Sequence, residues 1–197
     1  MAVTREQFES GMTYDAYKAQ MTRSRDRLEA NEKNIKIDAA DLEAFKKLPK
    51  PLKVLVIAED WCGDVIANLP IVGRLAQESG KLDVRVVLRD QSNLIDSYLN
   101  KGQFKSIPVV IFLDENFNEL GAFFERPDSV TKLRADKRGE VYKSNAKFGD
   151  PSAPPDQLPE DVRTELNAAL AKMRDETAPF YNKEATAWIR ELATKGS

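Results

Sequence analysis

A buried strand that leads through a short loop to a cysteine at the start of a helix is the feature that most constrains how this chain folds. Residues 52–58 form a short, nearly continuous apolar run rich in β-branched side chains, which is typical of a strand buried on both faces. From Cys62 to Ser79 apolar side chains recur at helical spacing, and Gly80 ends the pattern. The order of strand, loop, cysteine and helix indicates an α/β fold.

The segments that follow extend this pattern into a sheet. Further strands are predicted over residues 84–88, 108–113 and 119–124, with a short helix over 92–99. The turn-forming residues at 114–116 predict a hairpin between the last two strands. We therefore predict a central mixed four-stranded sheet flanked by helices on both faces.

The ends of the chain are predicted to be helical extensions. In residues 1–51, Thr4 and Gln7 form a capping-box pattern, Thr13 begins a longer helix, and Asp38 begins a third. The C-terminal extension, 127–197, is predicted to contain a helix ending near 137, a surface loop over 139–159, and a helix that Pro179 breaks or kinks. We predict one domain over 1–197, with its core at about 52–126. The amphipathic terminal helices cover the sheet or form a homodimer surface.

Composition and charge exclude several classes of function. The 197 residues include one cysteine and no histidine, and the formal net charge is −2. These counts exclude an intrachain disulfide, a Cys-His pair and a His-ligated metal site, and they argue against a nucleic-acid or anionic membrane partner. The chain shows no signal sequence, membrane span or Gly-rich phosphate loop. We expect a cytoplasmic protein without metal or cofactor.

Cys62 is the candidate reactive group. A thiol at a helix N-terminus meets free backbone N–H groups and the positive end of the helix dipole, and both favour the reactive thiolate. The carboxylate of Asp64, two residues later, opposes this effect by repulsion between like charges. The alternative is that Cys62 is a buried, inert side chain.

These residues resemble a known family. Trp61-Cys62-Gly63-Asp64 resembles the Trp-Cys-Gly-x-Cys motif of thioredoxins, and above all that of bacterial thioredoxin-like proteins with a Trp-Cys-Gly-Asp-Cys motif. Pro70 is similar to the proline that kinks the active-site helix in thioredoxins. The segment Ser106-Ile107-Pro108-Val109 resembles the family's loop whose Ile-Pro bond is cis and faces the cysteine. The likeness covers about residues 52–126 and implies a thioredoxin-like fold.

The resemblance implies which residues form the site. Cys62 would be the nucleophile, and the residues that bind the substrate would be Trp61, Gly63, Asp64, Ile107 and Pro108. Two departures bear on the chemistry, because Val65 stands where thioredoxins have the second, resolving cysteine and Val56 stands where many have a buried aspartate.

Without a second thiol, the chain cannot complete a dithiol cycle alone. We expect single-cysteine thiol–disulfide exchange with a protein or a low-molecular-weight thiol such as glutathione. The alternative is a non-catalytic module that binds a protein or peptide with the same patch. A third reading is that Val65 records an engineered change from cysteine.

Overall fold

The chain divides into two units, one made of Met1–Arg126 together with Asn182–Ser197 and the other made of Pro127–Tyr181. The computed structural model describes residues 3–194. The first unit contains the sheet and Cys62, and the second consists of helices and loops. The single domain over 1–197 stays a prediction.

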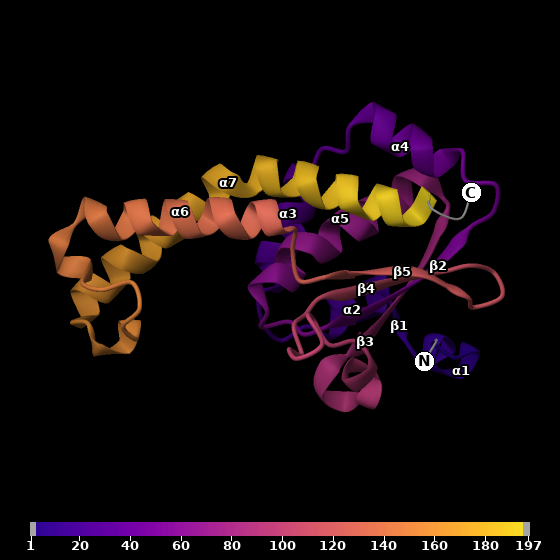
Figure 1. Cartoon of the computed structure of the whole chain (residues 1–197), viewed down its shortest axis with the longest axis horizontal. Helices are drawn as coiled ribbons and strands as arrows, with labels where there is room; N and C mark the ends of the chain where they lie inside the picture. The colour runs from indigo at the N-terminus through magenta and orange to yellow at the C-terminus, as the bar shows by residue number, and fades with distance from the viewer. Residues whose placement is uncertain (1–2, 195–197) are drawn as a thin grey trace. The chain divides into compact units, whose positions relative to one another are not determined.

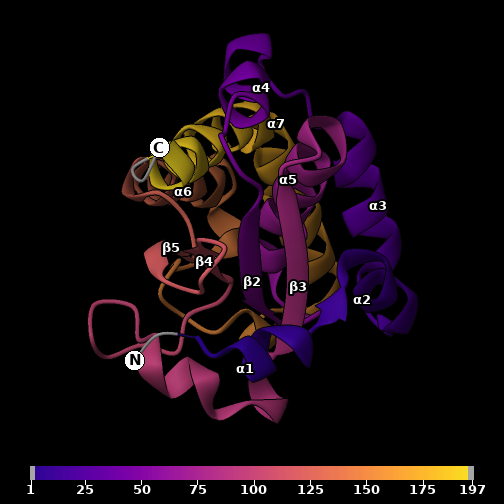
Figure 2. The same cartoon turned by 90° about the vertical axis from the view of Figure 1, so that its right-hand side faces the viewer.

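A mixed sheet with β2 at its centre organises the first unit (Figures 1 and 2). The described residues form five strands in the order β1-β3-β2-β4-β5. β2 pairs in parallel with β3 and antiparallel with β4, while β1 and β5 pair antiparallel with β3 and β4. The strands are β1 (Met12–Thr13), β2 (Leu52–Ala58), β3 (Leu82–Leu88), β4 (Val109–Leu113) and β5 (Glu119–Phe124).

The prediction of four strands was therefore one strand short. The additional strand, β1, has only two residues, which pair with Val86 and Arg85 of β3. Two residues are too few to produce the alternating pattern by which a strand is recognised in a sequence. Pairing with a distant part of the chain defines β1.

Helices on both sides of the sheet complete the first unit. Figure 1 shows α3 and α5 on one side of the strands and α1 on the other. Figure 2 shows β2 and β3 side by side. The helical segments are α1 (Arg5–Glu9), α2 (Tyr14–Gln20), α3 (Arg25–Asn34), α4 (Ala39–Lys46), α5 (Gly63–Ser79), η1 (Arg89–Gln91), η2 (Asn93–Ser97) and the end of α7 (Glu160–Thr194).

Local signals set several of these helix boundaries. The predicted capping box is present, since the Thr4 hydroxyl accepts from the Gln7 amide and the Gln7 side chain accepts from the Thr4 amide. Thr13 caps α2 as expected. The longer helix predicted after Thr13 is two helices, α2 and α3, because the chain leaves the helical conformation between them. Tyr17 in α2 and Leu28 in α3 are nevertheless both fully buried.

The end of α7 packs against the edge of the sheet within the first unit. The rings of Trp188 and Phe123 lie 4.4 Å apart, centroid to centroid. A Cβ atom on Gly121 of β5 would lie 2.8 Å from a methyl group of Leu192. This close approach explains a glycine in that strand.

The second unit has a small core of its own. It contains α6 (Asp128–Ser144), η3 (Ala146–Phe148), η4 (Pro155–Gln157) and the first part of α7. Its buried core residues are Tyr142, Phe148, Val162 and Leu166.

No helix within residues 3–194 is both long and apolar enough to cross a membrane.

The helix end predicted near residue 137 is wrong, and of the break or kink predicted at Pro179 the break is absent. α6 continues through Gly139 to Ser144, and α7 continues through Pro179. A glycine costs a helix only about 1 kcal/mol relative to alanine, and the residues that follow it include the buried Tyr142, whose ring lies edge-on to that of Phe148. In α7 the apolar positions continue on both sides of the proline, and Met173 and Tyr181 of this unit are buried. Their burial favours a continuous helix despite the hydrogen bond that a proline cannot make.

Candidate functional site

Cys62 lies at the end of the loop that joins β2 to α5. It occupies the N-cap position of α5, and its side chain is half-buried. The Sγ–H group donates a hydrogen bond to the backbone carbonyl of Ile107, with 3.4 Å between sulfur and oxygen. The structure thus brings together two segments that the sequence analysis assigned to one site. The Ile107–Pro108 peptide bond is cis.

Several effects act on the protonation of Cys62. Burial raises the pKa of the thiol and is the largest effect, while the backbone N–H groups of Val65 and Asp64 lower it. The carboxylates of Asp64 and Glu125 raise the pKa further. The net direction is upward, so the helix N-terminus does not prevail over burial and neighbouring charge. At neutral pH the thiol form therefore predominates.

Trp61 presents an exposed ring beside the cysteine. The residue is 45% exposed, and it is one of three exposed large apolar residues within residues 3–194. The guanidinium carbon of Arg89 lies 4.8 Å from the centroid of the Trp61 ring, which is within range of a cation–π interaction. From the sequence, Arg89 and Asp90 at the end of the second predicted strand are read as a solvated pair of loop residues, with a cation near the site as the alternative. The structure places the cation beside Trp61.

The loop before Cys62 is anchored on both sides. Asp60 accepts hydrogen bonds from the backbone N–H groups of Thr22 (2.8 Å) and Arg23 (2.9 Å), which join α2 to α3. Glu59 accepts from the backbone N–H of Asp90 at 2.9 Å. These contacts fix the loop that carries Trp61 and Cys62.

The remaining residues predicted to bind the substrate differ in exposure. Gly63 is exposed, and a Cβ atom built on it would have no neighbour within 4 Å. Asp64 is partly buried, and the side chains of Ile107 and Pro108 are buried. Ile107 therefore presents its backbone carbonyl to the cysteine rather than an apolar surface.

A polar network that the sequence analysis missed surrounds Asp64. Arg126 pairs with the Asp64 carboxylate and, at 2.8 Å, with Glu125. The fully buried amide of Asn68 donates to the backbone carbonyls of Asp64 (2.9 Å) and Glu125 (2.8 Å). The network ties the first turn of α5 to the end of β5. The sequence signal that could have indicated this network is Asn68, a polar residue among the apolar positions of the predicted helix.

The two positions that depart from the thioredoxin pattern both lie in the interior. Val65, in the first turn of α5, and Val56, in the middle of β2, are each fully buried. Val56 pairs with Val86 on one side and with Val110 on the other. The interior beneath Cys62 is therefore apolar at both positions.

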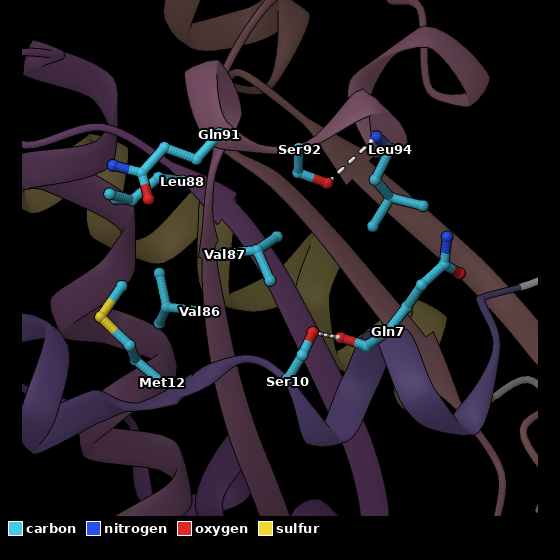
Figure 3. Close-up of a pocket in the computed structure, with 9 residues that line it drawn as sticks. All are labelled: Gln7, Ser10, Met12, Val86, Val87, Leu88, Gln91, Ser92 and Leu94. Atoms are coloured by element: carbon cyan, nitrogen blue, oxygen red, sulfur yellow. Dashed lines mark hydrogen bonds between the residues drawn. The ribbon is translucent and has the colours of Figure 1, made fainter.

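A separate cavity of about 290 Å³ lies beside the end of β3. Figure 3 shows Met12, Val86 and Leu94 among its apolar residues and the amide groups of Gln7 and Gln91 among its polar ones. Its serine hydroxyls already make hydrogen bonds to neighbouring backbone groups. Cys62 does not line this cavity.

No group of three or more side chains suited to hold a metal ion occurs in the described part of the chain.

Comparisons with known structures agree with the fold described above. A crystal structure of an HIV epitope-scaffold matches with a TM-score of 0.66 and 17% identity, over 100% of this chain and 99% of that one. A protein of unknown function from Pseudomonas aeruginosa matches with a TM-score of 0.62 and 20% identity, over 89% of this chain and 99% of that one. At such identities these two likenesses show the fold alone. No curated protein matches the chain.

The family comparison covers the sheet and the candidate site. The family model described as thioredoxin matches residues 11–138, which is more than half of the 197 residues. The matched range includes Cys62, the Ile107–Pro108 segment and all five strands of the sheet. The chain belongs to the thioredoxin family.

Proposed function

We propose that the protein carries out thiol–disulfide exchange through the single thiol of Cys62. The observation that most directly supports this is the position of the sulfur, half-buried at the N-terminus of α5 and 3.4 Å from the Ile107 carbonyl. Once the thiol loses its proton, the N–H groups of Asp64 and Val65 favour the anion. The thiolate is the nucleophile in disulfide exchange.

The exchange has two steps. The Cys62 thiolate attacks one sulfur of a partner disulfide, so that a mixed disulfide forms and the other partner sulfur leaves as a thiolate. Because Val65 replaces the second cysteine of the motif, an external thiol must attack the mixed disulfide and release Cys62. The net reaction transfers a disulfide bond between partners. The external thiol is a low-molecular-weight thiol such as glutathione, or the thiol of a protein.

A single cysteine suits a reducing compartment, and we propose that the protein acts in the cytoplasm.

Mass spectrometry of the intact protein tests this function. Incubation with oxidised glutathione should add one glutathione to the wild-type protein, and reduced glutathione should remove it. The Cys62→Ser variant should form no adduct. A folded protein that forms no adduct, although Cys62 reacts after unfolding, would show that the thiol is inert.

A second cysteine at position 65 should restore a dithiol cycle. Val65→Cys places two thiols in the first turn of α5, where a disulfide needs only local adjustment. We expect this variant to gain measurable turnover of a disulfide substrate with a dithiol reductant, because the second thiol acts at high effective concentration. Val65→Ala is the matched control and should show no such gain. Turnover is measured by reduction of insulin.

The second candidate function is a non-catalytic module that binds a protein or peptide at the same surface. The raised pKa of Cys62, set by burial and by the carboxylates of Asp64 and Glu125, favours this reading because it lowers the thiolate population. The exposed ring of Trp61 would supply the contact surface. If Val65→Cys forms its disulfide but reduces nothing, the binding module becomes the better account.

A further inference from the structure

A cation stacked on the aromatic ring next to Cys62 defines one side of the candidate site. Arg89 follows β3 directly, and its guanidinium carbon lies 4.8 Å from the Trp61 ring centroid. The backbone of Asp90 is held by Glu59 at 2.9 Å, which fixes the ends of β2 and β3 relative to each other. Arg89 is thus held beside the residue that directly precedes Cys62.

The guanidinium of Arg89 is only partly used by the protein. Its Nε atom donates to Asp90 at 2.7 Å. Within residues 3–194, its two terminal nitrogens make no hydrogen bond or ion pair, and the side chain is 25% exposed. A guanidinium edge of this kind binds a carboxylate through two parallel hydrogen bonds.

The other charges around the cysteine are mainly acidic. Asp64 and Glu125 share Arg126, and Glu59 and Asp90 lie beside Arg89. The pKa of Arg89 is raised, first by its hydrogen bond to Asp90 and further by the charges of Asp90, Glu59 and Cys62. The charge on the Cys62 sulfur is thus among those that act on the Arg89 guanidinium. Without it, the surroundings would repel an anionic partner.

We propose that Arg89 and Trp61 select partners that carry a carboxylate close to the reacting sulfur. The carboxylate binds the terminal nitrogens of Arg89, while the carbon chain of the partner lies on the Trp61 ring. This inference names the partner class of the exchange proposed for Cys62 and rests on that function. It predicts acidic low-molecular-weight thiols and disulfides as the preferred partners.

Three symmetric disulfides that differ in charge test the preference. The probes are dithiodipropionic acid, hydroxyethyl disulfide and cystamine, which are acidic, neutral and basic. The rate of mixed-disulfide formation at Cys62 is measured for each by mass spectrometry. We expect the acid-to-amine rate ratio of the wild-type protein to exceed that of a free thiol, because the thiolates that leave these disulfides differ in pKa. Arg89→Gln should lower that ratio by up to roughly fivefold, the upper end of the range for exposed ion pairs.

Two variants serve as controls for charge and structure. Arg89→Lys keeps the positive charge without the fork and should retain part of the preference. Arg27→Gln removes an exposed arginine from α3 and should leave all three rates unchanged. If Arg89→Gln slows all three disulfides by the same factor, Arg89 acts on the thiol rather than on the partner, and the inference is wrong.

A binding measurement separates this inference from the exchange function. In the Cys62→Ser variant, dithiodipropionic acid should shift the indole N–H resonance of Trp61, assigned by a Trp61→Phe variant, and the additional change Arg89→Gln should abolish the shift. A shift without any exchange in the wild-type protein would refute the exchange function and leave the carboxylate site standing. The absence of a shift together with unaltered exchange ratios in Arg89→Gln would refute the site alone.

Discussion

At Cys62, opposing effects act on one sulfur atom. The N–H groups of Asp64 and Val65 favour the thiolate, as expected for a cysteine at a helix N-terminus. Burial is the larger effect, and the carboxylates of Asp64 and Glu125 add to it, so the pKa is raised. The reactivity of the site therefore depends on its neighbours as much as on its position in the helix.

Removing the carboxylate at position 64 should make Cys62 more reactive at neutral pH. Below the pKa, the thiolate fraction rises tenfold for each unit by which the pKa falls. Because the charge of Asp64 raises the pKa, Asp64→Asn should lower it and move the pH profile of thiol labelling to lower pH. We expect labelling at pH 7 to become roughly three- to tenfold faster.

The labelling rate of Cys62 with iodoacetamide, followed over a range of pH, measures this effect. Asp26→Asn removes an exposed carboxylate from α3 and is the matched control. A profile that does not move in Asp64→Asn would mean that the charge of Asp64 does not raise the pKa of Cys62.

On the scale of elements, α5 is held by a very close contact with α2. A Cβ atom built on Gly73 would lie 2.4 Å from Cε1 and 2.7 Å from Cζ of the Tyr14 ring. Cβ atoms do not approach other heavy atoms so closely, so only glycine fits between this helix and the ring. The contact lies within the same helix that carries the cysteine at its N-terminus.

Gly73→Ala should therefore destabilise the protein. The ring of Tyr14 must move, and overpacking of this kind costs about 1–3 kcal/mol. Urea unfolding measures the loss. Gly63→Ala, in the same helix but with no neighbour within 4 Å, should change stability by less than about 0.5 kcal/mol. Adding Tyr14→Leu to Gly73→Ala should recover part of the loss, and equal effects of the two glycine changes would rule out the steric explanation.

On the scale of the whole molecule, the chain has two units with separate cores. The sheet and its helices form one, and Pro127–Tyr181 forms the other. In the second unit, Leu166 is fully buried in a cluster with Tyr142, Phe148 and Val162. The prediction that the chain is a single domain means, in physical terms, that the two units unfold together.

Leu166→Ala should loosen the second unit first. Removal of a buried leucine side chain costs about 2–4 kcal/mol through lost burial and the cavity that remains. We expect hydrogen exchange to become faster in α6 and in the first part of α7, while the amides of β2 keep their protection. The matched control is Leu55→Ala in β2, which is equally buried and should affect the sheet. Equal loss of protection in both units would indicate one cooperative domain.

Sequence alone predicted those features that depend on residues near one another in the chain. The apolar run of β2, the stripe and glycine stop of α5, and the capping box of Thr4 and Gln7 all depend on local periodicity or local hydrogen bonds. The cysteine at the start of α5 follows from the same local pattern. These elements form as predicted because their local preferences agree with the fold.

Tertiary structure decided what depends on contacts between distant segments. The strand β1 exists because it pairs with β3, and α6 continues past Gly139 in a unit where Tyr142 is buried. In the site, the stacking of Arg89 on Trp61 and the charges around Cys62 join segments far apart in the sequence. Such contacts depend on distance in space, which local periodicity does not report. Their energies exceed the small conformational preferences of individual residues, which are all that a local sequence pattern reflects.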